Sequence, residues 1–434
     1  MINYFLKSSP APLIDSELEQ KARYKKLKWQ VFISATLGYG IYYVCRLSIN
    51  VVKKPIVDSG LLTETELGII GSALFFSYAF GKLTNGFLAD YSNINRFISI
   101  GLLVSALANL IMGFTSGFYF FVVCWAINGW AQSMGAPACI VSLSRWYTDK
   151  ERGSFYGFWS TSHNIGEAIT YILTAVIATS FGWQWGFKAA AIVGLIGVIT
   201  LQLFFHDSPE SKGLPSVNKD LNNEKKSTWD EQKSVIKNPY VWILAFSSAF
   251  MYISRYAVNS WGPYYFETAK GYTLTQANTL VAISAVCGIL GTALSGFVSD
   301  KIFKGRRNKP ALIFGLMNVF SLCLFLLGPK NVWWIDVISM VTFGLGIGAL
   351  ICYLGGLMAV DIASKQASGA ALGIVGIMSY LAAGIQDIAS GYLIESNKTI
   401  LNNETIYDFN SITIFWIFSA SFSLILALFA WKKT

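Results

Sequence analysis

The sequence Gly86-Phe-Leu-Ala-Asp90 returns 210 residues later as Gly296-Phe-Val-Ser-Asp300. Basic residues follow both copies, with Arg96 after the first and Arg306 and Arg307 after the second. A motif that recurs over so long a distance predicts a duplicated structural unit rather than two unrelated loops.

Other residues recur at nearly the same distance. Asp149-Lys-Glu-Arg-Gly153 is matched 216 residues later by Lys365-Gln-Ala-Ser-Gly369, and Arg46 is matched by Arg255 after 209 residues. Because these offsets agree, the chain is expected to consist of two homologous halves.

The composition excludes a soluble enzyme, a disulfide scaffold and a disordered chain. Hydrophobic residues make up 54% of the 434 residues and charged residues only 13%, whereas soluble domains average about 25% charged residues. The apolar residues form blocks of about 20, which is the length that crosses a bilayer as a helix. We expect an all-α membrane protein with twelve transmembrane helices, at about residues 31–52, 67–89, 97–115, 119–143, 155–180, 184–205, 240–264, 276–298, 311–327, 333–358, 368–393 and 411–431.

One long polar stretch interrupts this series. It lies at residues 206–238 and contains Asn222-Asn-Glu-Lys-Lys226. We therefore expect an N-terminal segment at 1–28, a six-helix half at 29–205, an ordinary charged linker at 206–238 and a second six-helix half at 239–434.

The basic residues predict the orientation in the membrane. The two chain ends, the even-numbered loops and the central stretch hold 24 of the 33 Lys and Arg residues. The opposite side holds six, among them Lys53, Lys54 and Lys270, and the remaining three lie within spans. The positive-inside rule then places both termini in the cytoplasm, and we expect a bacterial inner-membrane location.

Charged residues within the spans are candidate functional residues, because a charge in the middle of a bilayer is costly. Arg46 and Arg255 each lie 15 residues into their span, so the two halves place one guanidinium each at a similar depth. Two such cations repel each other, and an anion with two charges between them would relieve the repulsion. Guanidinium groups suit phosphate because two parallel N–H donors match two oxygens.

Polar and aromatic residues share helix faces with these charges. Tyr39 and Tyr43 precede Arg46 at helical spacing, Tyr252 precedes Arg255, and Tyr78 precedes Lys82. This spacing predicts a polar cavity. On the fifth span, His163 lies between Trp159 and Glu167.

Structural explanations remain open for each of these residues. The arginines could form ion pairs with Glu167 or Asp387, His163 could be a core histidine, and the tyrosines could be ordinary packing. Catalytic and metal sites have no support, because the chain has two histidines and no Cys/His ligand spacing. The six cysteines all fall within spans and are expected to be free thiols.

The chain resembles the organophosphate:phosphate antiporter family of the major facilitator superfamily. The resemblance rests on Gly38-Tyr-Gly-Ile-Tyr-Tyr-Val-Cys-Arg46, Tyr78-Ala-Phe-Gly-Lys82, Trp159-Ser-Thr-Ser-His163-Asn164, His206-Asp-Ser-Pro-Glu-Ser-Lys-Gly-Leu-Pro215 and Tyr252-Ile-Ser-Arg255-Tyr256. It implies that Arg46 and Arg255 bind phosphate and that His163 contributes. It also implies that Lys82 and the tyrosines line the cavity. The full set of expected binding residues is Arg46, Arg255, His163, Lys82, Tyr39, Tyr43, Tyr78, Tyr252, Trp159, Asn164 and Tyr380.

The repeated loop motif is also characteristic of that superfamily. The resemblance implies that its acidic residue pairs with an arginine to close the cytoplasmic side, which assigns this role to Asp90, Arg96, Asp300, Arg306 and Arg307.

Several positions depart from the glycerol-3-phosphate branch of the family. Leu47 replaces a lysine, Ala136-Pro-Ala-Cys139 replaces Trp-Pro-Pro-Cys, and Ala285 replaces an acid. Asp387 lies in the eleventh span, where charges influence selectivity among the hexose-phosphate relatives, and Glu167 is a second selectivity candidate. These differences favour a sugar phosphate over glycerol 3-phosphate.

Two kinds of function remain open. The first is a monomeric carrier that exchanges a sugar phosphate, such as hexose 6-phosphate, for inorganic phosphate, with a glycerol-3-phosphate:phosphate antiporter as the alternative of the same kind. The second is a membrane sensor that binds the same ligand and signals to a partner kinase, since the family includes such sensors. Neither function requires a cofactor, a metal or a nucleic acid, and both require the lipid bilayer.

Overall fold

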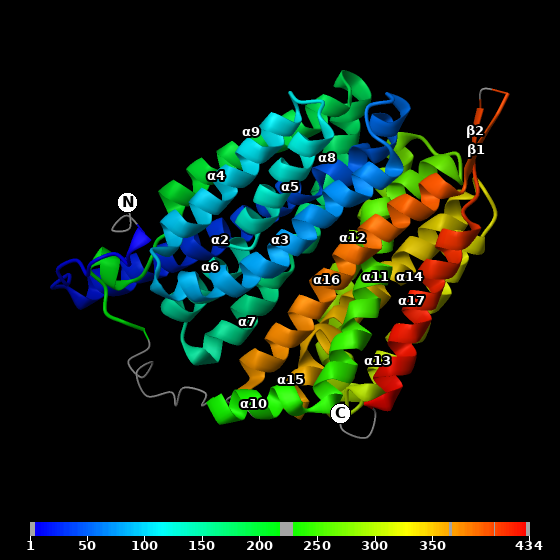
Figure 1. Ribbon diagram of the computed structural model, residues 1–434. Coiled ribbons are helices and arrows are strands. Elements are labelled where there is room, and N and C mark those ends of the chain that lie inside the picture. The colour runs from blue at the N-terminus through cyan, green and yellow to red at the C-terminus, as the bar shows by residue number, and fades with distance from the viewer. Residues whose placement is uncertain (1–4, 218–228, 364–366, 403, 431–434) are drawn as a thin grey trace.

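The structure, a computed structural model, describes all residues except 1–4, 218–228, 364–366, 403 and 431–434. It is a bundle of long helices that run along a common direction, with α2 to α9 on one side and α11 to α17 on the other (Figure 1). We call the end of the bundle where α2 begins and α17 ends the terminal end. The opposite end carries a small β-hairpin and is called the hairpin end.

Helices occupy all twelve of the expected ranges. In the first half they are α2 (Glu17–Asp58), α3 (Glu64–Tyr91), α4 (Ile94–Met112), α5 (Phe118–Gln132), α6 (Gly135–Trp146), α7 (Asp149–Ser160), α8 (Ser162–Phe181) and α9 (Trp183–Phe204). In the second half they are α11 (Pro239–Thr268), α12 (Leu274–Phe297), η2 (Val298–Ile302), α13 (Asn308–Leu327), α14 (Trp333–Cys352), η3 (Tyr353–Leu357), α15 (Met358–Ile362), α16 (Ser368–Ser396) and α17 (Asn410–Phe429).

Local sequence signals fix several of the helix starts. Ser16 caps α2, and Thr63 and Thr273 form capping boxes with Glu66 and Gln276 at the starts of α3 and α12. Such caps satisfy backbone N–H groups that have no partner within the helix. Ten helices among the described residues are long and apolar enough to cross a membrane.

The first helix corrects the expected boundary of the first span. Helix α2 continues to Asp58, so Lys53 and Lys54 lie within it rather than in the following loop. Lys53 is completely buried, as is Lys270 in the connection after α11. These two lysines therefore do not belong to an exposed loop, although both lie toward the hairpin end.

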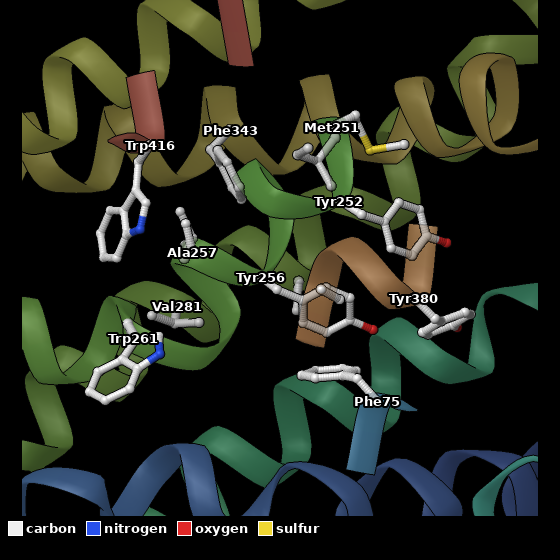
Figure 2. Packing of buried hydrophobic residues seen from close by; sticks show 14 of the residues in the cluster. Phe75, Met251, Tyr252, Tyr256, Ala257, Trp261, Val281, Phe343, Tyr380 and Trp416 are labelled. Atoms are coloured by element: carbon white, nitrogen blue, oxygen red, sulfur yellow. The ribbon is translucent and has the colours of Figure 1, made fainter. Parts of the chain in front are cut away.

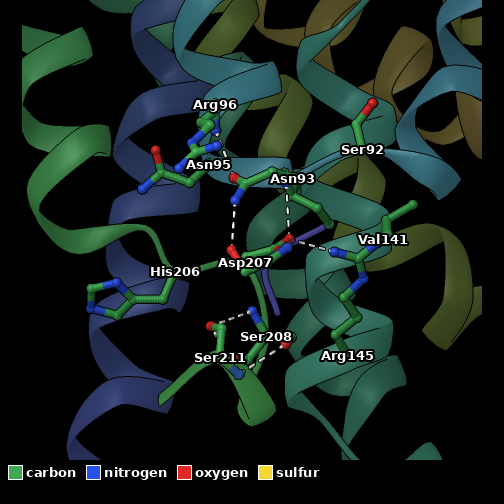
Figure 3. Close-up of polar contacts among 12 residues, drawn as sticks. Ser92, Asn93, Asn95, Arg96, Val141, Arg145, His206, Asp207, Ser208 and Ser211 are labelled. Carbon is green, nitrogen blue, oxygen red and sulfur yellow. Dashed lines mark hydrogen bonds and ion pairs between the residues drawn. The ribbon is translucent and has the colours of Figure 1, made fainter. Parts of the chain in front are cut away.

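Part of the expected linker is packed against the first half. Asp207 accepts hydrogen bonds from the backbone N–H groups of Ser8 (2.8 Å) and Ile94 (3.0 Å), and it pairs with Arg145 (Figure 3). The segment before α2 also bonds to this turn, since Ala11 N–H donates to the Glu210 carbonyl. An ordinary charged linker was therefore the wrong expectation for residues 206–214.

The described part of the central stretch also contains two short helical elements. A 3₁₀ turn, η1 (Glu210–Lys212), and a short helix, α10 (Trp229–Lys237), flank the gap in the description. The Asn222–Lys226 stretch, as well as Lys365 and Gln366 of the second repeat, lie outside the described residues.

The two halves are held together at the hairpin end. Strands β1 (Lys398–Leu401) and β2 (Glu404–Tyr407) form an antiparallel hairpin that hydropathy did not predict. Glu64 of α3 is buried there and accepts bonds from Tyr264, Lys398 and Tyr407 of the second half, at 2.8, 2.6 and 2.9 Å. Glu395 of α16 accepts a bond from the Thr65 N–H at the start of α3.

Candidate functional site

Arg46 lies in the C-terminal half of α2 and is 2% exposed. Its Nη2 donates to the hydroxyl of Tyr256 on α11 at 3.3 Å, and its guanidinium carbon lies 4.4 Å from the ring centre of Tyr78. Its Nε has no hydrogen-bond partner among the described residues. A buried guanidinium with an unused donor is a costly arrangement, and it leaves Arg46 able to take a further acceptor.

Arg255 occupies the corresponding place on α11 and is 5% exposed. Its Nη2 lies 3.8 Å from Oε2 of Glu167, which is longer than the 2.7–2.9 Å typical of a tight charge-assisted bond. Glu167 Oε1 instead accepts a 2.6 Å bond from Asn259. The structural ion pair with Glu167 is thus present, but it leaves Arg255 able to take another acceptor.

A cavity of about 560 Å³ lies between the two halves and extends from Arg255 toward the terminal end. This volume falls within the usual range of small-molecule sites. Nine of the eleven expected binding residues line it: Tyr39, Tyr43, Tyr78, Lys82, Trp159, His163, Tyr252, Arg255 and Tyr380. The remaining two, Arg46 and Asn164, each line a separate, smaller cavity.

Aromatic rings pack against one another and against the cations around this cavity. Tyr380 of α16 lies 4.5 Å from Tyr78 and 5.5 Å from Tyr252, measured between ring centres. The rings of Tyr256, Tyr380 and Phe75 lie together, and the hydroxyls of Tyr252 and Tyr256 lie on the same side (Figure 2). Lys82 Nζ lies 5.5 Å from the Tyr380 ring centre. These rings give the arginines and Lys82 cation–π contacts.

The two selectivity candidates lie on the hairpin side of the cavity. Glu167 shares a small cavity with Asn164, Arg255 and Asn259. Asp387 shares another with Arg46 and Asn50, but its ion pair is with Lys53, at 3.0 Å. The sequence therefore identified Asp387 as a possible partner of an arginine, whereas the structure gives it a lysine.

The repeated loop motifs contact residues within their own halves. In the first half, Arg145 of α6 donates to the backbone carbonyl of Asp90. In the second, Arg307 pairs with Asp361 of α15. Asp300 and Arg306 are exposed, and Arg96 lies in the first turn of α4. The assignment of these residues to a gate remains a prediction.

Sequence reasoning missed several residues at these sites. Tyr256 directly follows Arg255, and adjacent residues do not share a helix face, so helical spacing gave no signal for it; Asn259, one turn after Arg255, is identified by its spacing. Arg145 and Asp361 are 216 residues apart, which is the offset of the second repeated motif, so the repeat could have identified them as equivalent positions. Lys53 gave no such signal, because it lies next to Lys54 at the apparent end of an apolar span.

A family model described as Major Facilitator Superfamily matches residues 32–386. This chain belongs to the major facilitator superfamily. Solved structures of other transporters share the fold. A bacterial homologue of the human lysosomal transporter Spinster, in an inward-facing and unoccupied conformation, matches with a TM-score of 0.73 over 94% of this chain and 96% of its own, at 16% identity.

Curated superfamily relatives are more similar in sequence. The membrane sensor protein UhpC of Salmonella typhimurium is 30% identical over 89% of both chains. A probable hexose phosphate transport protein of Chlamydia trachomatis is 34% identical over 85% of both, and the glycerol-3-phosphate transporter of Bacillus subtilis is 31% identical over 88% of this chain and 89% of its own. This superfamily member is therefore related to organophosphate transporters and to UhpC, and it is not an enzyme.

Proposed function

We propose that the chain is a carrier that exchanges a sugar phosphate, such as hexose 6-phosphate, for inorganic phosphate. The observation that carries the proposal is the pair of buried arginines, one from each half, beside a cavity large enough for a small ligand. Arg46 has an unused donor, and Arg255 has only a long ion pair. A phosphate dianion would supply the missing acceptors for both guanidinium groups.

The position of the arginines supports exchange rather than free passage. Both are attached to long helices, α2 and α11, that belong to different halves. An anion bound to both would draw the halves together around it. Without an anion, closing the cavity would leave two desolvated cations in apposition, which is strongly unfavourable. The empty carrier should then reorient slowly, so a bound anion is needed in both directions.

The lining of the cavity supports a polar organic group on the phosphate. Trp159 and the tyrosines offer flat apolar faces with polar edges, which suit the ring of a sugar. Asn164, Glu167 and Asn259 offer amide and carboxylate groups to hydroxyls. On the proposed orientation, the terminal end faces the cytoplasm of a bacterial inner membrane, the loop motifs act as its gate, and the protein works as a monomer.

Exchange can be tested in proteoliposomes loaded with labelled phosphate. Label should leave only when phosphate or an organophosphate is present outside, and hexose 6-phosphate should compete better than glycerol 3-phosphate. Efflux at a similar rate into phosphate-free buffer would contradict obligatory exchange. A preference for glycerol 3-phosphate would contradict the assignment of a sugar phosphate.

A sensor is the second candidate, because UhpC is similar to the chain over almost its whole length. A sensor would bind hexose phosphate to the same arginines without rapid exchange. Saturable binding to the purified protein together with no exchange in the vesicles would favour the sensor, and exchange would exclude it as the sole function.

A further inference from the structure

The ion pair between Lys53 and Asp387 joins the two halves on the hairpin side of Arg46. Lys53 belongs to α2 and Asp387 to α16, and their side chains are 0% and 1% exposed. Asp387 Oδ1 accepts three bonds, from Lys53 Nζ at 3.0 Å, from the Ser260 hydroxyl at 2.6 Å and from the indole N–H of Trp261 at 2.6 Å. One oxygen of the carboxylate is therefore fully used.

The other oxygen is unused. Asp387 Oδ2 has no hydrogen-bond partner among the described residues, and Arg46 Nε has none either. Arg46 and Asp387 line the same small cavity, together with Asn50 and Gly71. A donor and an acceptor of opposite charge thus face one cavity without bonding to each other.

The close approach of α3 keeps the carboxylate in this place. A Cβ atom at Gly71 would overlap Asp387 Oδ2, and one at Gly68 would lie against the Asp387 backbone carbonyl. Lys53 is held as firmly, because its Nζ also donates to Ser260 at 2.7 Å and lies 3.7 Å from the Trp261 ring centre. The carboxylate is thus held beside the lysine through its Oδ1 atom, while Oδ2 packs against Gly71 without a hydrogen bond to any described residue.

We infer that Lys53 keeps Asp387 from neutralising Arg46, and so keeps Arg46 available to the anionic ligand. The inference rests on the proposed phosphate site. Lys53 is then a positioning residue that touches no ligand. The charged residues around the two small cavities and the main cavity give a net positive charge. The two arginines, Lys53 and Lys82 contribute four positive charges, and Glu167 and Asp387 contribute two negative charges. The sum is about +2, which matches the charge of a phosphate dianion. Without Lys53, Asp387 would be a buried carboxylate whose remaining cationic neighbour at the shared cavity is Arg46.

Neutral variants of similar size test this inference. Lys53→Met should weaken the binding of inorganic phosphate to the purified full-length protein by at least about tenfold, because Asp387 then competes for Arg46. Asp387→Asn should bind as tightly as the wild type or more tightly. The double variant Lys53→Met/Asp387→Asn should recover affinity to within about threefold of the wild type.

A second buried pair provides the matched control. Lys270 Nζ also lies 3.0 Å from an aspartate oxygen, that of Asp336, with side chains 2% and 0% exposed. This pair lies within the second half, and Asp336 Oδ2 is satisfied by the Tyr272 hydroxyl at 2.8 Å. Lys270→Met should lower the unfolding temperature but leave the phosphate affinity of the folded protein unchanged.

Two results would overturn the inference. The first is phosphate affinity within about twofold of the wild type in Lys53→Met. The second is a double variant as weak as Lys53→Met, which would mean that Lys53 acts on the ligand itself. A structure of Lys53→Met without ligand tests the position of the Asp387 carboxylate independently of phosphate binding. It should show the Asp387 carboxylate bonded to Arg46, and a carboxylate left in place would refute the inference even if the wild-type protein bound no phosphate.

Discussion

Arg46 and Tyr256 are 210 residues apart in the chain, yet the guanidinium of one donates to the hydroxyl of the other at 3.3 Å. Tyr256 also lies beside Arg255, whose guanidinium carbon is 5.4 Å from the centre of its ring. One tyrosine of the second half thus contacts the central arginines of both halves. This contact joins α2 of the first half to α11 of the second half.

Replacing Tyr256 by Phe should weaken phosphate binding by about tenfold, since a hydrogen bond to a charged group contributes ~1.5–3 kcal/mol. The reason is that the Arg46 guanidinium loses the acceptor that holds it in place between the two halves. Calorimetric titration of phosphate into the purified protein measures the change. Tyr265→Phe is a control, because the Tyr265 hydroxyl donates to the Leu326 carbonyl away from the cavity. Equal affinities in the wild type and Tyr256→Phe would show that the bond does not position Arg46.

Each central arginine should be irreplaceable by lysine. Lysine keeps the charge but has no planar pair of donors, so Arg46→Lys or Arg255→Lys should reduce phosphate affinity by at least about tenfold in a protein that remains folded and inserted. The same conservative change at Arg145, which pairs with Asp207 at the terminal end, should leave affinity unchanged. Near-normal binding by either central variant would instead favour a structural ion pair.

Lys398 should help to keep the hairpin end closed. It is 26% exposed and pairs with the buried Glu64 across the halves at 2.6 Å. Removing it by Lys398→Met should favour opening at that end, by on the order of fivefold for ~1 kcal/mol. The measurement is the rate at which a membrane-impermeant maleimide labels Asn50→Cys, in a background without the six native cysteines.

The control for this prediction is another lysine of the hairpin end. Lys330 is exposed, and Lys330→Met should leave the labelling rate unchanged. If Lys398→Met and Lys330→Met label alike, the cluster around Glu64 does not hold the two halves together.

His206 should make the fold sensitive to acid. Burial and, to a smaller extent, the positive charge of Lys212 together lower the pKa of its imidazole to about 4. The unfolded chain, with a histidine pKa near 6.5, binds more protons between these two values. Stability should therefore fall as the pH falls from about 6.5 toward 4. The unfolding temperature in detergent at pH 7.5 and at pH 5 measures this loss.

The His206→Asn variant isolates the contribution of the imidazole. It should lose less of its unfolding temperature between the two pH values than the wild type does. An equal loss in both proteins would assign the sensitivity to other groups.

The sequence by itself predicted the twelve ranges that helices occupy, the family and the matching positions of the two arginines in their spans. Hydropathy, helix caps and repeat offsets can all be read along a single chain. They locate the helices because apolar blocks of this length are buried in lipid as helices. The cavity residues also followed, because Tyr39, Tyr43 and Arg46 share a helix face at a fixed period.

Only the tertiary structure decided which charges pair. Lys53 bonds to Asp387 at a separation of 334 residues, and Asp207 joins the segment before α2 to the start of α4. Such pairings depend on how each helix is rotated about its axis and on which helices are neighbours. No periodic pattern in the sequence indicates either of these. A lysine at the apparent end of a span looks solvated, and becomes a buried ion pair only because α2 continues for another turn beside α16.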